Sequence, residues 1–460
     1  MNNAIFPHLK FINFKDISYW TTKRFFAKEL MFSKKYPLKL FGYFLEKITP
    51  KTEQIEDEKN YPIIGVRSYG LGAYINRISL GKNLKMKKYQ LAEENHLIWC
   101  KVDTKNGAFA IVTSNLRNSY ASSNMALAKI DNSKIINDYL QLIFKSKKIQ
   151  KYLDSFVSGT TNRKYIKIDE LLSKIQIPLP SLEIQEEFVK KYNDKIKLAE
   201  EQETKVLQLE NDIEKYLFRE LDIDEQTKEN EIQNKNLLSF TDLKNLSRWG
   251  VEYLKTQKSD NTLLKSRTIS MRKLGSIVEI DPKNNFSALN KDLEMSFIPM
   301  QCISDEYGEI VKLENGINEK SKGYTRFQEG DLVWAKITPC MQNGKSAILK
   351  GLKNGYGYGS TEFYVIRNSN SNICLDYIYH ILRTKLVRWN AVKYFTGSSG
   401  QQRVPKSYLQ NLEIPLPDFD KQKNISNQIY AIKMKIKKLK QEAEQNRIAA
   451  QEEFEKELFE

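Results

Sequence analysis

Few residues in this chain have the types and spacing that catalysis or metal binding requires. The 460 residues include three histidines, and none of them lies within five residues of another. Four cysteines are scattered without a Cys-x-x-Cys pair, whereas zinc ligands recur at short spacing. We therefore predict packing or surface roles for the histidines and small apolar roles for the cysteines, with no metal site. These residues are His8, His96, His380, Cys100, Cys302, Cys340 and Cys374.

Strings that resemble cofactor or catalytic motifs are incomplete. Gly70-Leu71-Gly72 lacks the third glycine of a dinucleotide loop, and Gly355–Gly359 is not followed by the Lys-Ser/Thr of a phosphate loop. Ile280–Lys283 departs at its third position from the Asn/Asp-Pro-Pro-aromatic motif of adenine methyltransferases. Asp418 and Asp420 stand too close together for a nuclease site, and we expect them to cap the helix that follows. The sequence thus indicates a binding protein with no catalytic residues of its own.

The charge distribution indicates a polyanionic partner. The formal net charge is +16, and it is concentrated in residues 1–181 (+15) and 236–417 (+8). Residues 182–235 carry −7, and residues 418–460 carry equal numbers of acids and bases. Basic surfaces of this kind suit nucleic acid, so the two basic regions are expected to face it. The sequence shows no membrane-spanning stretch and no secretory segment at Met1–His8, which favours a cytoplasmic protein.

The two basic regions are copies of one another. Leu97–Val102 (LIWCKV) returns as Leu332–Ile337 (LVWAKI), an offset of 235 residues. Ile177-Pro178-Leu179-Pro180 returns unchanged as Ile414-Pro415-Leu416-Pro417, at an offset of 237. Because repeats at nearly constant offset identify tandem copies, we predict two similar domains. The predicted boundaries are 1–181 and 236–417 for the domains, 182–235 for a spacer helix and linker, and 418–460 for a second spacer helix.

Each copy is predicted to be an α+β domain, with a mixed β-sheet and short helices. Short apolar runs such as Phe109–Val112 and Phe363–Ile366, bounded by polar residues and glycine, are typical of strands. Apolar residues at three- and four-residue spacing predict helices near 135–153 and 374–394. Trp99 and Trp334, inside repeated apolar strings, are expected in the core.

Each domain is followed by the pattern of a long helix. In the second copy, apolar residues from Ile425 to Ala450 follow one another by alternating steps of four and three, as in a coiled-coil seam. The first copy keeps the pattern less strictly over about 182–221, a length of about 60 Å as a helix. Each helix could pack on its own domain, but pairing of the two as a coiled coil would cover both apolar stripes. Asn446 at a seam position could set the register or lie at a solvated end.

The combination of these features resembles the specificity subunit of Type I restriction-modification systems. Gly330–Lys345 (GDLVWAKITPCMQNGK) is close to the family's usual string, and both copies end in Ile-Pro-Leu-Pro before a long helix. The first copy departs from the pattern, with His96 before its strand and Asp103–Gly107 after it. The resemblance covers essentially the whole chain.

The resemblance implies that each domain recognises one half of a split, asymmetric DNA target while the helices space the domains. It also implies partners: double-stranded DNA, two methyltransferase subunits, and restriction/translocase subunits where the system has them. S-adenosylmethionine, ATP and Mg would then be bound only by the partner subunits, and this chain would need no cofactor. Half-sites on one face of B-DNA lie about 34–36 Å apart per turn, a separation that a helix of about 60 Å can accommodate.

Candidate DNA contacts are polar, basic and aromatic residues in loops near the repeated strings, because such side chains recognise base edges and phosphates. In the first domain they are Arg67, Tyr69, Lys101, Lys105, Asn106, Arg117, Asn118, Tyr120, Asn124, Thr160, Asn162, Arg163 and Lys164. In the second they are Lys336, Gln342, Asn343, Lys345, Tyr356, Tyr358, Ser360, Ser398, Ser399, Gln401, Gln402 and Arg403. The loops around Gly159 and Gly397 are favoured, since glycine permits close approach of the backbone to phosphate.

Two other functions remain open at this point. A self-contained DNA methyltransferase or nuclease with an unrecognised active site would modify or cleave DNA as the purified chain alone. A coiled-coil scaffold with incidental basic charge would bind duplex DNA as weakly at low salt as at high salt. The DNA-recognition subunit is the hypothesis that we favour.

Overall fold

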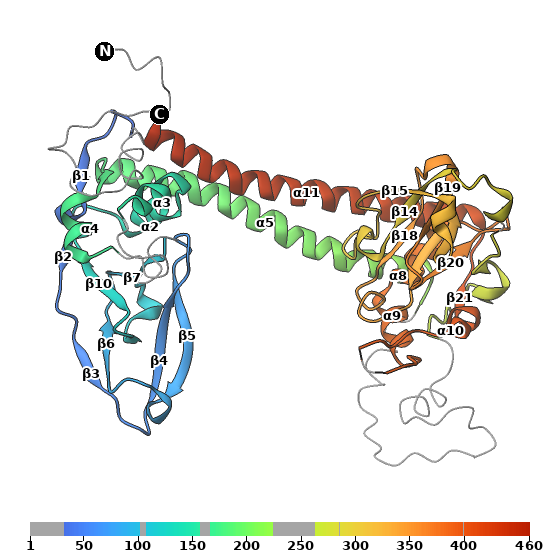
Figure 1. The fold of residues 1–460 in the computed structure, drawn as a ribbon, viewed down its shortest axis with the longest axis horizontal. Coiled ribbons are helices and arrows are strands. Elements are labelled where there is room, and N and C mark those ends of the chain that lie inside the picture. The colour runs from blue at the N-terminus through green and yellow to red at the C-terminus, as the bar shows by residue number, and fades with distance from the viewer. Residues whose placement is uncertain (1–31, 102–106, 157–165, 224–262, 285, 399) are drawn as a thin grey trace. The chain divides into compact units, whose positions relative to one another are not determined.

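The chain, whose structure is a computed structural model, is described over residues 32–101, 107–156, 166–223, 263–284, 286–398 and 400–460. Its contacts divide it into two units, and each unit combines one domain with parts of both long helices. Unit 1 comprises residues up to 202 together with 441–460, and unit 2 comprises residues 203–440. Figure 1 colours the chain from blue at the N-terminus to red at the C-terminus.

Within the residues that the structure describes, the domain of unit 1 contains two main sheets and three α-helices. One sheet has the order β2-β10-β7-β8, the other has the order β3-β6-β9-β4-β5, and β1 pairs with β11. The strands are β1 (Leu38–Leu40), β2 (Leu45–Lys47), β3 (Thr52–Gln54), β4 (Asn60–Val66), β5 (Ala73–Leu80), β6 (Lys88–Ala92), β7 (His96–Cys100), β8 (Phe109–Ile111), β9 (Ser119–Ala121), β10 (Met125–Ile130) and β11 (Gln176–Pro178). The helices are α2 (Asn137–Lys145), α3 (Lys147–Asp154) and α4 (Ile168–Lys174).

The domain of unit 2 repeats this plan. Its sheets have the orders β13-β20-β17-β18 and β15-β14-β19-β16, and β12 pairs with β21. The strands are β12 (Met271–Lys273), β13 (Glu279–Ile280), β14 (Glu294–Ile298), β15 (Glu314–Ile317), β16 (Thr325–Gln328), β17 (Leu332–Ala335), β18 (Ser346–Ile348), β19 (Tyr356–Gly359), β20 (Phe363–Arg367) and β21 (Glu413–Pro415). The helices are α8 (Leu375–Arg383), α9 (Lys385–Val392) and α10 (Lys406–Asn411). The predicted α+β class and the repeat are confirmed.

The repeated tryptophans lie in the two cores. Trp99 is 0% exposed and stacks on Phe109, with ring centroids 5.9 Å apart. Trp334 is 1% exposed and stacks on Tyr364 at 6.5 Å. Both side chains come from the central strands β7 and β17, so the prediction of a core role is confirmed.

The departure of the first copy from the Gly-Asp string leaves the local backbone unchanged. In unit 2, Gly330 has a φ of 83°, and the buried Asp331 forms a bidentate pair with Arg367, with both N–O distances 2.7 Å. In unit 1, Asn95 takes the glycine's place with a φ of 63°, a region that asparagine tolerates better than most residues. His96 replaces the aspartate and is buried, so desolvation lowers the pKa of its imidazole. In both copies, the residue two positions before the first leucine of the central strand therefore has a left-handed backbone conformation.

A buried glutamine joins each domain to its long helix at the repeated Ile-Pro-Leu-Pro. Gln185 accepts the Ile136 N–H (2.8 Å) and donates to the carbonyls of Lys134 (3.3 Å) and Pro180 (2.9 Å). Gln422 is its counterpart and forms three equivalent bonds, to the Cys374 N–H (2.9 Å) and to the carbonyls of Asn372 (3.3 Å) and Pro417 (2.8 Å). Since neither glutamine is more than 1% exposed, each satisfies backbone groups that water cannot reach.

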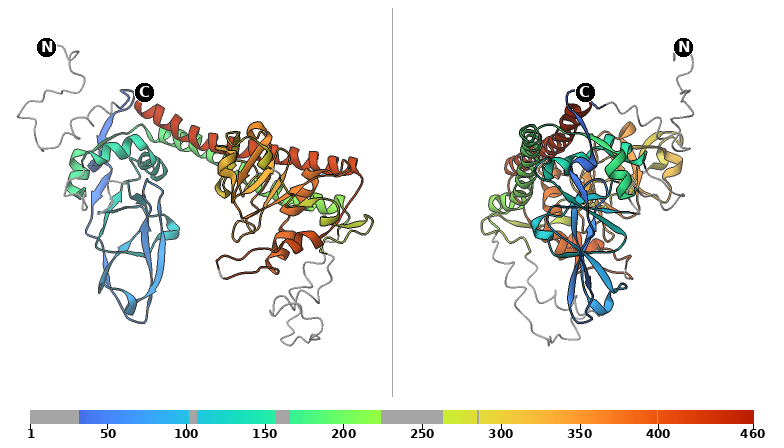
Figure 2. Two further views of the ribbon diagram at one scale, coloured as in Figure 1. Left: turned by 45° about the vertical axis from the view of Figure 1, so that its right-hand side comes forward. Right: turned by 90° about the vertical axis from the view of Figure 1, so that its left-hand side faces the viewer.

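The long helices pair along their apolar seams within each unit. They are α5 (Leu182–Glu220) and α11 (Phe419–Phe459), and they lie side by side in Figures 1 and 2. In unit 1, Phe188 packs edge-on against Phe454 with centroids 6.1 Å apart, and Asn446 donates to the Gln202 side chain at 3.0 Å. In unit 2, Lys440 bonds Glu210 at 2.8 Å. The predicted coiled-coil pairing is confirmed.

The two remaining helix predictions also have clear outcomes. Asp418 accepts the Lys421 N–H at 2.8 Å, which confirms it as the cap of α11. Asn446 contacts the opposite helix, so it is not at a solvated end.

Within the described parts of the chain, no helix combines the length and apolarity that crossing a membrane requires.

Candidate nucleic-acid interface

Three segments that carry second-domain candidates meet at one end of the β13-β20-β17-β18 sheet. Lys336 directly follows β17, and its N–H donates to the carbonyl of Glu362, just before β20, at 2.9 Å. The Val404 N–H donates to the Lys336 carbonyl at 2.9 Å, and the Thr338 N–H donates to the Gln402 carbonyl at 3.0 Å. Antiparallel pairing of β17 with β20 makes this meeting possible, because it places the end of one strand beside the start of the other.

Arg403 holds the loop around Gly397 to this sheet edge. Its Nε and Nη2 donate to the two carboxylate oxygens of Glu362, each at 2.8 Å, and its Nη1 donates to the Gln401 carbonyl at 2.9 Å. The Arg403 guanidinium lowers the pKa of the Glu362 carboxyl, and Lys336 lowers it further. Because Glu362 engages two of its nitrogens, Arg403 serves mainly to position the loop. Ser398 and Gln401 remain exposed there, and Gln402 is half-buried.

Beside Lys336, a polar hollow of about 290 Å³ opens between the two main sheets of unit 2. Its floor is Phe363 and Val365, and its walls include Asn284, Tyr324 and Arg326. Asn284 donates to the Arg326 carbonyl at 2.7 Å, which fixes the Asn284 amide, and the Tyr324 ring is 46% exposed. Sequence analysis missed these residues. The string Gly323-Tyr324-Thr325-Arg326, with glycine, an aromatic ring, a hydroxyl and a base, was the available signal.

Of the three candidates in the loop after β17, one is exposed and two form hydrogen bonds within the domain. Asn343 is exposed. Gln342 is half-buried, accepts the Thr338 hydroxyl through its side chain, and accepts the Arg388 guanidinium through its carbonyl. The Lys345 ammonium points into the domain and donates to the carbonyls of Ile303 (2.9 Å) and Met300 (3.3 Å). Lys345 therefore stabilises the fold, and we no longer count it as a DNA contact.

Of the β19 candidates, Tyr358 belongs to the core. Tyr358 is 4% exposed and lies against Phe297 and Tyr324, with centroids 5.1 and 5.5 Å away, and burial raises the pKa of its hydroxyl. Tyr356 is half-buried and packs edge-on against Phe286 at 5.5 Å. The Ser360 hydroxyl accepts the N–H of Glu362 at 3.2 Å and so shapes the turn before β20. None of these three is placed as a free surface contact.

Lys101 and Asn124 in unit 1 occupy the position equivalent to the Lys336 edge. The Lys101 N–H donates to the Asn124 carbonyl at 2.9 Å, and its ammonium donates to the Ser123 carbonyl at 2.9 Å. They follow β7 and precede β10, the counterparts of β17 and β20. Both side chains are exposed, so both stay candidates for DNA contact.

The other first-domain candidates that the structure describes lie on or beside strands of the five-stranded sheet. Arg67 and Tyr69 are exposed in the turn between β4 and β5, where the Arg67 guanidinium lies 4.8 Å from the Tyr74 ring centroid. Arg117 and Asn118 are exposed just before β9. Tyr120 is 7% exposed and donates to Glu53 at 2.7 Å, which places it in the core and removes it from the candidates. The predicted residues of this domain therefore form more than one group.

Seven candidates lie outside the described residues. They are Lys105, Asn106, Thr160, Asn162, Arg163, Lys164 and Ser399. The loop around Gly159, which sequence analysis favoured, falls there as well. Among the residues that the structure does describe, no group of three His, Cys, Asp or Glu side chains is arranged to hold a metal ion.

Comparison with protein-family models gives matches over both repeats. The model of the Type I restriction modification DNA specificity domain matches residues 33–211 and again residues 267–447. The chain belongs to this family. The two matched ranges repeat at nearly the offset found by self-comparison, and each includes most of one domain and most of the long helix that follows.

Individual relatives carry the corresponding name. The specificity subunits of the Type I restriction enzymes EcoEI and EcoAI, both from Escherichia coli, are 40% identical over 157 residues and 39% identical over 150 residues. These matches cover 33% and 32% of this chain and 25% of each relative, so the chain matches a quarter of each relative's length.

A solved structure shares the fold at low sequence identity. A chain from a structure on complex assembly and conformational transition of the type I R-M system matches 93% of this chain and 98% of its own length, with a TM-score of 0.54 and 14% identity. The HsdS subunit from Thermoanaerobacter tengcongensis matches 92% of this chain and 96% of its own length, with a TM-score of 0.48 and 14% identity.

Proposed function

We propose that this chain is the DNA-specificity subunit of a Type I restriction-modification complex and recognises a bipartite, asymmetric DNA target. The observation that carries the proposal is the double match of the specificity-domain family to two basic domains, each joined to a paired helix. The polar residues differ between the equivalent edges, with the exposed Lys101 and Asn124 in one and the half-buried Lys336 and Gln402 in the other. Two different half-sites are the expected consequence.

The chain itself is proposed to be non-catalytic and to act through partners. Methylation would be performed by two methyltransferase subunits, which bind S-adenosylmethionine, and any cleavage by restriction/translocase subunits, which use ATP and Mg. Double-stranded DNA is the proposed common partner, since the positive charge of both domains matches its phosphates. The proposed location is the cytoplasm.

Two roles are assigned within the second domain. Lys336 is proposed to contact phosphate, because its ammonium is a single strong charge at the sheet edge. Gln402 is proposed to contact a base edge, because an amide can donate and accept at the same time. Its backbone is anchored to Thr338, which fixes the direction of approach.

The test is co-expression with the cognate methyltransferase subunit, followed by single-molecule sequencing of DNA methylation. A split motif that carries N6-methyladenine is expected. Gln402→Ala should relax base preference in one half of the motif only, by about 1–3 kcal/mol at the affected position. Lys336→Ala should weaken binding for all sequences and reduce the salt slope by about 1. Absence of any bipartite motif with the wild-type chain would refute the proposal.

A further inference from the structure

The C-terminal part of each long helix contacts the domain of the other repeat through a glutamate. In unit 1, the Glu455 carboxylate of α11 accepts the N–H of Lys147, the first residue of α3, at 2.8 Å. In unit 2, the Glu214 carboxylate of α5 accepts the N–H of Leu386, the second residue of α9, at 3.3 Å. Since α3 and α9 are equivalent helices of the two domains, the two units contain similar contacts, one residue apart along the helix, with the long helices exchanged.

These glutamates occupy a favourable electrostatic position. The first N–H groups of a helix have no partner within the helix, and its N-terminus carries a partial positive charge. A hydroxyl already caps each helix, because Ser146 accepts the Ile149 N–H and Thr384 accepts the Val387 N–H, each at 3.3 Å. The carboxylate satisfies one further N–H of each helix and adds a charge-assisted bond.

The capped helices are connected to the candidate interface. In unit 2, Arg388 of α9 donates both to the carbonyl of Gln342, in the loop after β17, and to the carbonyl of Arg383 at 3.1 Å. Gly344 leaves room for this guanidinium, since a Cβ there would lie 3.1 Å from its Nη1. In unit 1, Gln150 of α3 takes the place of Arg388 and lies beside Gly107 in the same way. In both units the capped helix therefore packs beside the glycine that follows the central strand of its domain.

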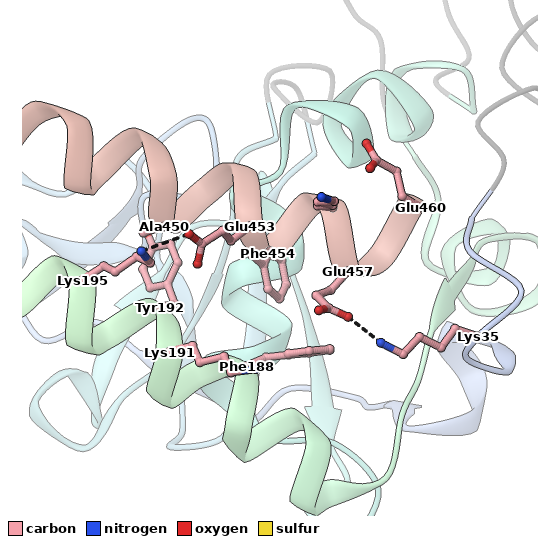
Figure 3. A pocket seen from close by; sticks show the side chains of 11 residues that line it. Lys35, Phe188, Lys191, Tyr192, Lys195, Ala450, Glu453, Phe454, Glu457 and Glu460 are labelled. Atoms are coloured by element: carbon pink, nitrogen blue, oxygen red, sulfur yellow. Dashed lines mark hydrogen bonds and ion pairs between the residues drawn. The ribbon is translucent and has the colours of Figure 1, made fainter.

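Other contacts fix the last turns of α11 around Glu455. A groove of about 560 Å³ lies at this end of the helix pair. Figure 3 shows two ion pairs among the side chains that line it. Glu453 pairs with Lys195 of α5 at 3.0 Å, and Glu457 pairs with Lys35 at the start of the domain at 2.7 Å. Glu453, Glu455 and Glu457 of α11 thus bind α5, α3 and Lys35 at the start of the domain, in that order. In unit 2, the Glu210–Lys440 pair fixes α5 to α11 in the same way.

We propose that Glu214 and Glu455 are positioning residues that set the orientation of each recognition domain about the helix pair, and through it the number of base pairs between the two half-sites. The buried glutamine and a shared apolar core hold each domain against both long helices. Apolar contact has no preferred direction, whereas the glutamate adds a bond of defined direction from the other helix to one domain helix. This inference rests on the proposed function.

The experiment maps methylation in cells that co-express the methyltransferase subunit with the full chain carrying Glu455→Gln, Glu214→Gln or both. Glutamine keeps the shape of the side chain and removes the charge. We expect both half-site sequences to stay unchanged, while sites whose gap differs by one base pair rise about tenfold in relative methylation. A charge-assisted hydrogen bond exceeds a neutral one in strength by an amount that corresponds to about that factor. Glu452→Gln and Asp212→Asn, exposed on the same helices, are the matched controls and should keep the wild-type gap.

The outcomes separate this inference from the proposed function. If the wild-type chain gives no bipartite motif, the proposed function fails. If the wild-type motif is present and the glutamine and alanine variants all keep its single gap, only the positioning role is refuted. Altered base preference within a half-site would refute it too, since that result assigns the glutamates to sequence recognition. Should glutamine retain enough of the bond to mask the effect, Glu455→Ala and Glu214→Ala remove it entirely, and an unchanged gap in these folded variants is decisive against the proposal.

Discussion

Replacing the buried glutamine Gln185 by leucine should destabilise unit 1 and leave unit 2 intact. Leucine has nearly the same size but leaves the Ile136 N–H and the carbonyls of Lys134 and Pro180 without the bonds that Gln185 forms. Each buried group left unpaired costs about 1–3 kcal/mol, and the longer bond to Lys134 belongs at the low end. Burial of the more apolar side chain returns about 1–2 kcal/mol. The expected net loss is about 3 kcal/mol, or about 100-fold in the unfolding equilibrium.

Hydrogen exchange in urea, read by mass spectrometry, measures this effect in each domain separately. Peptides that contain β11 should exchange faster in Gln185→Leu, while peptides that contain β21 should keep the wild-type rate. Gln422→Leu should give the reverse pattern with similar size, because its three bonds are equivalent. Gln208→Leu, exposed on α5, is the control and should change stability by less than about 0.5 kcal/mol. Losses under 1 kcal/mol in both buried variants, or equal effects on both domains, would refute this reasoning.

Three further predictions concern single side chains. Lys433 lies in α11, where burial and the charge of Arg383 lower the pKa of its ammonium to about 7. The unfolded chain therefore binds more protons than the folded chain between pH 7 and about 10.5, so the unfolding free energy should rise with pH over that window. Lys433→Met should flatten this rise when unfolding is measured by urea titration. Asp331→Asn breaks the buried pair with Arg367 and should cost about 3 kcal/mol in the same titrations, and a loss below 1 kcal/mol would contradict this. Tyr120→Phe should cost about 1 kcal/mol with unchanged DNA affinity in a filter-binding assay, and an affinity loss would restore Tyr120 as a contact.

The sequence was sufficient to predict the repeat, the domain class and the pairing of the long helices. These features depend on patterns spread over many residues, such as the seam from Ile425 to Ala450 and the strings around Trp99 and Trp334. Such patterns survive individual substitutions, as the exchange of Gly330 for Asn95 shows. The physical cause is that periodic burial is imposed by the element as a whole.

The individual contacts were less accessible to prediction, because residue type does not reveal which way a side chain points. Tyr358 and Lys345 have the chemistry of DNA contacts, yet one is buried and the other bonds backbone carbonyls. Gln185 is a polar residue near the start of an amphipathic helix, where solvent exposure is the ordinary expectation, and only the tertiary structure shows its partners. Arg403 and Glu362 are 41 residues apart in the chain, and no local pattern links them.

The matching glutamines Gln185 and Gln422 have a consequence for how such a protein can evolve. Each makes its three bonds to main-chain atoms, which are present whatever side chains a domain carries. Mutations on the outer loops can therefore accumulate without breaking the bonds between each domain and its long helix. One domain can then acquire a new DNA sequence preference while the other domain keeps its own.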